Sequence, residues 1–169
     1  MQYVWNCFWL VVPILLMNAL LMQRLPRAYQ SEVFGRGIPR WIGAGENLFR
    51  TAVFTLPLLM PLRVATPGQK IGLALYLTGV AVYFLAWGMQ IRHPQTAWSA
   101  SRAGFLAPAY TPSLWLAGIG LIGDSLYAGA AYRSWMYLAL SAAFLAFHNA
   151  HAWMVYLREA GAGPVQVKL

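Results

Sequence analysis

The sequence predicts an all-α integral membrane protein, a single bundle of five transmembrane helices with its N-terminus outside and its C-terminus in the cytoplasm. The first observation is composition: 60% of the 169 residues are hydrophobic and 9% are charged, whereas about a quarter of an ordinary soluble domain is charged. The second is that the apolar residues gather in five runs, each long enough to cross a hydrocarbon layer about 30 Å thick.

The five predicted spans lie at about 3–22, 41–62, 71–91, 112–132 and 134–157. No internal repeat or flexible linker divides residues 1–169, so we expect one domain. The single cysteine, Cys7, excludes an internal disulfide.

The first span, 3–22, carries no charge and follows no basic residue. A cleavable signal peptide needs a positive region before its apolar core and small residues at its cleavage site. We therefore expect this span to stay in the mature chain. The loop 23–40 that follows holds four arginines against Glu32 alone, an excess that is typical of a cytoplasmic loop.

The second span, 41–62, opens with a polar half. Glu46 and Arg50 are four residues apart and share a helix face. Two interpretations stay open: they form an ion pair at the membrane interface with Arg50 reaching toward water, or they turn inward to a cavity, because facing lipid is costly. Pro57 and Pro61 are expected to weaken and kink the outer half of this helix.

The third and fourth spans differ in their small residues. Span 71–91 has no charge, whereas 112–132 carries glycines such as Gly118, which let neighbouring helices approach closely. Asp124, inside the fourth span, is expected at the outer interface beside Arg133.

The segment 92–112 between these spans is polar and contains three prolines. Pro108 and Pro112 oppose a continuous helix through its second half. We therefore predict an ordered re-entrant or interfacial loop here.

The fifth span, 134–157, combines small residues with histidines. Ala142, Ala146 and Ala150 recur at four-residue spacing, which predicts a packing stripe against another helix. His148 and His151 are three apart and share a face. Zinc and iron sites usually need three or four ligands, so we predict hydrogen-bonded histidines and no metal site.

The formal charge of +8 does not indicate nucleic-acid binding, because the basic residues lie in short loops beside apolar runs, where the positive-inside rule accounts for them. Nine basic residues fall on one predicted side: Arg24, Arg27, Arg36, Arg40, Arg50, Arg92, Arg102, Arg158 and Lys168. Three fall on the other: Arg63, Lys70 and Arg133. This bias indicates the orientation, and we expect a multi-pass protein of a bacterial inner membrane.

The same layout gathers polar side chains at the cytoplasmic face, where they predict a pocket. The candidate catalytic residues are His148, His151, His93 and Glu46. The candidate substrate-binding residues are Arg50, Arg92, Arg102, Trp98, Ser99, Tyr110 and Asn149. Histidine can move a proton near neutral pH, and arginine can hold a phosphate or carboxylate.

The tripeptide Arg92-His93-Pro94, directly after the third span, resembles the Arg-His-Pro element of isoprenylcysteine carboxyl methyltransferases and related membrane phospholipid methyltransferases. The resemblance covers these three residues and the span count. Gln95 and Thr96 stand where that family has an aromatic residue and a glycine, and its later paired glutamates are missing. The likeness implies a transferase-type enzyme on an amphipathic substrate by analogy only, and the sequence leaves the cofactor unknown.

Two classes of function remain. The first is a protein that binds membrane lipids or an amphipathic small molecule in its cytoplasmic-side pocket, as a lipid-modifying enzyme. The second is a non-catalytic membrane subunit or hydrophobic-ligand-binding protein, which acts through helix–helix assembly with a second copy or in a larger membrane complex. No nucleophile–base pair, phosphate loop or complete metal set separates the two.

Overall fold

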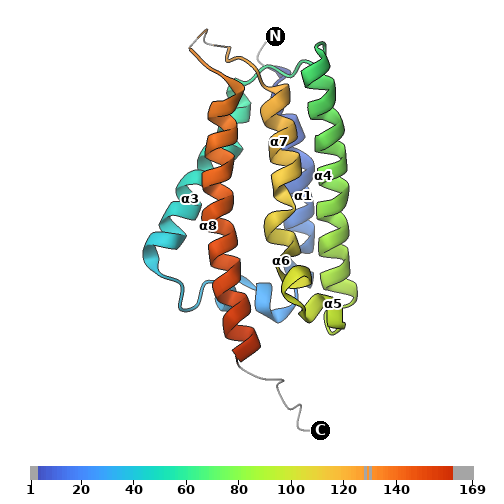
Figure 1. Ribbon diagram of the computed structural model, residues 1–169, viewed down its shortest axis with the longest axis vertical. Helices are drawn as coiled ribbons and strands as arrows, with labels where there is room; N and C mark the ends of the chain where they lie inside the picture. Colours follow the sequence, from blue (N-terminus) through green and yellow to red (C-terminus); the bar gives the residue numbers. More distant parts are fainter. Residues whose placement is uncertain (1–3, 128, 130, 162–169) are drawn as a thin grey trace.

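The computed structural model describes residues 4–127, 129 and 131–161, and over this part of the chain it is helical with no strand (Figure 1). Tyr3, the first residue of the first predicted span, and Lys168, one of the basic residues counted above, lie outside the described residues. Four helices are long and apolar enough to cross a membrane: Cys7–Arg24, Pro67–Arg92, Arg102–Ile122 and Ser134–Gly161. The prediction of an all-helical membrane protein is confirmed at this level.

The first candidate span is built from pieces that run end to end. They are η2 (Cys7–Leu10), α1 (Val12–Leu21) and η3 (Met22–Arg24). Two short helices follow, η4 (Arg27–Tyr29) and α2 (Ser31–Phe34), at the lower end of the bundle in Figure 1. This end is called the α2 end below.

The chain returns along the bundle through α3 (Arg40–Thr55) and η5 (Leu56–Leu59). Its last residues meet the start of the first span, because the Cys7 amide donates to the Met60 carbonyl at 2.8 Å. Pro57 interrupts the α-helical hydrogen bonds, as expected. The predicted span 41–62 is therefore a 16-residue α-helix with a 3-10 extension, and it is not one of the four candidate spans, so the count of five is not confirmed.

Helix α4 (Pro67–Arg92) packs along α7 (Pro112–Ile122) at close range. A Cβ at Gly118 would lie 2.6 Å from the Gly72 carbonyl oxygen, and one at Gly79 would lie 2.4 Å from the Trp115 amide nitrogen. These glycines bring the two backbones together, which confirms the predicted role of Gly118. At the end of α4 that lies away from α2, Gln69 Nε2 donates to Asp124 Oδ2 at 3.0 Å.

The predicted loop 92–112 and the predicted fourth span 112–132 are wrong in their boundaries. Two helices, α5 (Ala97–Ala100) and α6 (Arg102–Tyr110), fill the loop, and α6 and α7 together form the candidate span Arg102–Ile122. The helix tolerates Pro108 because a distant side chain replaces the missing amide: the Gly104 carbonyl accepts a hydrogen bond from Gln90 Nε2 at 2.6 Å. The described residues between Ile122 and Ser134 are not helical.

The last helix, α8 (Ser134–Gly161), packs against α3, α6 and α7. Its buried side includes Tyr137, whose hydroxyl donates to the Val53 carbonyl at 3.1 Å. The predicted stripe of Ala142, Ala146 and Ala150 is exposed. These alanines lie on the other side of α8 from its buried residues, so the stripe does not pack against another helix among the described residues.

Candidate functional site

Helices α3 and α8 cross closely at Gly45. A Cβ at this position would lie 2.4 Å from Cε1 of Phe147, so a larger residue would displace the Phe147 ring. The crossing brings the next residue, Glu46, against α8, where it is 2% exposed. Glu46 thus turns into the bundle, as in the second interpretation, but does not line the cavity described below, and the ion pair with Arg50 of the first interpretation also forms.

Three side chains contact the Glu46 carboxylate. His148 Nδ1 lies 2.8 Å from Oε1 and His151 Nδ1 lies 2.5 Å from Oε2. Arg50 donates to Oε1 from the same helix. A buried carboxylate needs such partners, because an unpaired buried charge is strongly destabilising. We call Glu46, Arg50, His148 and His151 the carboxylate cluster.

His151 faces an acceptor on both sides of its ring. Nδ1 faces Glu46, and Nε2 lies 3.1 Å from the Phe34 carbonyl oxygen. A neutral imidazole donates from only one nitrogen, so both hydrogen bonds form only when the Glu46–His151 pair holds one extra proton. With His148 neutral, the carboxylate cluster then carries one net positive charge, whichever of the two groups holds that proton.

His148 differs from His151 because one ring nitrogen is left open. Nδ1 contacts Glu46, whereas Nε2 has no hydrogen-bond partner among the described residues. Nε2 is also not among their fully buried polar atoms that lack a partner, so it is accessible. The side chain is 20% exposed. Its ring stacks on Phe144 with centroids 5.3 Å apart, and the Arg50 guanidinium carbon lies 5.9 Å from the same ring. Arg50 and His148 are therefore neighbours that share one carboxylate oxygen and one aromatic ring.

A cavity of about 610 Å³ borders the carboxylate cluster. Arg50 and His148 contribute to its wall, whereas Glu46 and His151 do not. Much of the remaining wall is apolar or aromatic; it includes Ile14, Leu21, Phe54, Trp87, Phe105, Trp115 and Phe144. The volume lies within the range of about 300–1,000 Å³ that is typical of small-molecule sites.

The exposed part of the cavity wall comes mainly from the first span and from α3. Leu15, Asn18 and Met22 on the first span and Thr51 and Thr55 on α3 line the cavity and are exposed at the surface. The opening thus lies between a candidate membrane span and the helix that carries Glu46.

At the α2 end, the segment between the first span and α3 closes the cavity. Tyr29 and Phe34 line its wall, and the Tyr29 hydroxyl donates to the Phe105 carbonyl at 2.8 Å. Arg158 of α8 donates to the Val33 carbonyl at 2.9 Å. Burial raises the pKa of Tyr29, which keeps this hydroxyl protonated as a donor.

Two other predicted site residues join α6 to α8. Asn149 Nδ2 donates to the Ala109 carbonyl at 3.2 Å, and the Arg102 guanidinium carbon lies 4.4 Å from the centre of the Trp153 ring. Both contacts position helices, and neither residue is in the described cavity wall.

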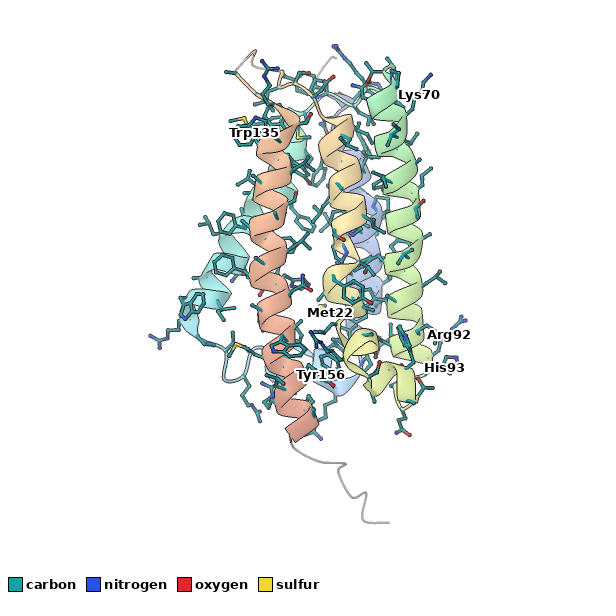
Figure 2. All side chains as sticks on the ribbon, viewed as in Figure 1. Met22, Lys70, Arg92, His93, Trp135 and Tyr156 are labelled. Carbon is teal, nitrogen blue, oxygen red and sulfur yellow. The ribbon has the colours of Figure 1, made fainter. Side chains whose placement is uncertain are left out.

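Four of the remaining predicted residues lie at the turn from α4 to α5 or in α5, and the fifth, Tyr110, is the last residue of α6. Arg92 and His93 are exposed at the end of α4 opposite Lys70 (Figure 2). Ser99 is buried and donates to the His93 carbonyl at 2.6 Å, so it stabilises the turn. Trp98 and Tyr110 are exposed; none of these residues contributes to the described wall of the cavity.

Several cavity residues were not predicted from the sequence. Tyr83 donates to Asn18 Oδ1 at 2.8 Å across the cavity wall, and Phe54, Trp87 and Trp115 also line it. Asn18 is a polar residue within an apolar run, which was an available signal. The aromatic residues gave none, because lipid-facing and cavity-facing aromatic residues look alike in an apolar run.

Comparisons with known proteins leave the site to be interpreted from its own geometry. No protein-family model matches this chain, and no curated protein or solved structure matches it.

Proposed function

We propose that this chain binds a lipid or another amphipathic small molecule in the cavity and that His148 exchanges a proton with its polar head. The observation that carries the proposal is the Glu46–His148 pair at the cavity wall, with Nδ1 on the carboxylate and Nε2 open. The Arg50 guanidinium lies beside it and supplies the positive charge for the head group.

The shape and lining of the cavity support an amphipathic ligand. Arg50 and His148 are neighbours in the wall, whereas most of the other lining residues are apolar or aromatic. The exposed wall residues of the first span and α3 form an opening on the lipid side. A molecule that resides in the membrane could therefore enter with its apolar part along the wall and its head at the carboxylate cluster.

The arrangement of His148 supports proton transfer. A carboxylate on Nδ1 holds the imidazole in one tautomer, with the hydrogen on Nδ1 and a lone pair on Nε2. Such a nitrogen accepts a proton from a bound O–H and returns it later, and imidazole does so near neutral pH. Proton transfer of this kind supports a lipid-modifying enzyme. His151, which lies outside the described cavity wall, acts as a positioning residue for Glu46.

We also propose that the α2 end faces the cytoplasm of a bacterial cell. Several basic residues belong to, or directly follow or precede, the segments at this end: Arg24, Arg27, Arg36, Arg92 and Arg102. Basic residues concentrate on the cytoplasmic side of membrane proteins. If α3 with η5 completes a fifth crossing, the chain starts outside and ends in the cytoplasm. The site then opens to the inner half of the bilayer.

The exposed alanine stripe of α8 favours a second candidate function, a non-catalytic membrane subunit. Ala142, Ala146 and Ala150 present a small-residue surface to the outside of the bundle, and such surfaces pack against partner helices in lipid. In that case the protein has no turnover of its own for substitutions in the cavity wall to change.

The test uses the full chain extracted in detergent, with the co-purifying lipid measured by mass spectrometry and turnover measured on extracted membrane lipids. Arg50→Gln should lose the co-purifying lipid, and His148→Gln should keep it while turnover falls by about 10²-fold or more. Arg24→Gln, an exposed arginine outside the described cavity wall, is the matched control. Unchanged lipid and turnover in both cavity variants would contradict the proposal and favour the assembly subunit.

A further inference from the structure

We infer that the ligand is an acidic lipid whose acid group carries its own O–H, that is, a lipid phosphomonoester or a free fatty acid. This inference rests on the proposed function and narrows it to a class of head group. It follows from the hydrogen-bonding capacity that remains at the carboxylate cluster once its internal contacts are made.

Arg50 and His148 offer opposite kinds of hydrogen bond at one place. Both contact the same Glu46 oxygen, Oε1, and both pack on Phe144. The Arg50 side chain is 45% exposed, and guanidinium has five N–H donors, so donors remain for a ligand. His148 Nε2, by contrast, is an acceptor when Nδ1 donates to Glu46.

A head group that satisfies both residues needs an acceptor oxygen and an adjacent donor O–H. A singly protonated phosphomonoester has both on one phosphorus atom, and a carboxylic acid has both on one carbon. A phosphodiester has acceptor oxygens but no acidic O–H, so it can bind Arg50 and leaves His148 Nε2 without a donor from the phosphate. A choline head group brings a cation close to the Arg50 guanidinium, and its phosphodiester has no acidic O–H for His148 Nε2.

The charge of the carboxylate cluster agrees with this class. When His151 donates to both of its acceptors, the cluster carries one net positive charge. The single negative charge of a singly protonated phosphomonoester neutralises it, whereas a neutral carboxylic acid leaves it unchanged, and proton transfer to His148 alters neither total. The step is a simple transfer: the ligand O–H bond breaks, the proton moves to Nε2, and the oxygen keeps the electron pair beside Arg50.

The α2 end of the cavity favours a small head group. Phe34 is in the wall and stacks on His151 with ring centroids 4.4 Å apart. Tyr29 stacks on Phe105 at 4.9 Å in the same region. These rings occupy part of the cavity wall beside the cluster and leave less room there for the glycerol or choline of a larger head group.

The experiment compares probes that share their oleoyl chains and differ in the head. Dioleoyl phosphatidic acid, phosphatidylglycerol and phosphatidylcholine form one set, and oleic acid with methyl oleate forms the other. Binding to the detergent-solubilised full chain is measured by native mass spectrometry. We expect the acid of at least one set to bind about tenfold or more tightly than the other lipids of its set, a difference that a charge-assisted hydrogen bond provides. The set that shows this preference tells whether the ligand is a phosphomonoester or a fatty acid.

Variants separate this inference from the proposed function. Arg50→Gln should weaken binding of every anionic probe, whereas His148→Gln should reduce the preference for the acid to about threefold or less and leave phosphatidylglycerol unchanged. The inference would be overturned, and the proposed function kept, by three results together. Phosphatidic acid and phosphatidylglycerol would bind equally, both would depend on Arg50, and oleic acid would bind no more tightly than methyl oleate. If Arg50→Gln weakens the binding of none of the probes, both the inference and the proposed function are overturned. If His148→Gln does not fold, the comparison of head groups on the native chain decides alone.

Discussion

Replacement of Glu46 by Gln should destabilise the fold far more than an ordinary loss of surface charge. The carboxylate is 2% exposed and holds two histidines whose side chains are 20% and 11% exposed. Arg50 is 45% exposed, so solvent screens its share of the interaction. Loss of one partner from a buried ionic group costs about 3–5 kcal/mol. At about 2–4 °C per kcal/mol for a chain of this size, the melting temperature should fall by roughly 6–20 °C.

The assay is thermal unfolding of the detergent-solubilised full chain, followed by circular dichroism. Glu32→Gln is the control, because Glu32 is exposed on α2 and surface substitutions usually change stability by no more than about 0.5 kcal/mol. Small and equal shifts for the two variants would refute the reasoning, since Glu46 would then behave as a solvated interfacial residue.

Three further predictions concern orientation, packing and pH. In a cysteine-free background, cysteines at Gly35 and at Val64, exposed near opposite ends of the bundle, should be labelled only from the cytoplasm and only from outside, respectively; the reverse pattern would contradict the proposed orientation. Gly118→Val should lower the free energy of unfolding by at least about 1–3 kcal/mol through overpacking, whereas Gly88→Ala, with open space at its Cβ, should raise it by about 0.5–1 kcal/mol; equal effects in chemical denaturation would disprove the close packing. Burial raises the pKa of Tyr29, so the contribution of its hydroxyl to stability is fully present below the unfolded pKa of about 10 and is lost as pH rises through the higher folded pKa. The difference in unfolding free energy between the native chain and Tyr29→Phe should therefore shrink above about pH 10. A difference that stays constant in alkaline unfolding would count against this.

Local spacing predicted the two halves of the carboxylate cluster but not their meeting. Glu46 and Arg50 share a face of one helix because they are four apart, and His148 and His151 share a face of another because they are three apart. Both statements depend on helix geometry alone. The contact between these faces depends on the α3–α8 crossing at Gly45 and Phe147, which pairs residues about a hundred positions apart in the chain.

The sequence by itself determined the class of protein and most of its helices. Sparse charge and long apolar runs leave a helical membrane protein as the stable form, because only internal hydrogen bonds satisfy the backbone in lipid. Tertiary structure decided where the helices end and what their polar residues do. Gln90 makes a helix of a segment that Pro108 appeared to forbid, and rings that look alike in an apolar run form the wall of one cavity. Hydrogen bonding along the backbone is local and can be predicted from neighbouring residues, whereas the partner of a side chain depends on how distant helices pack.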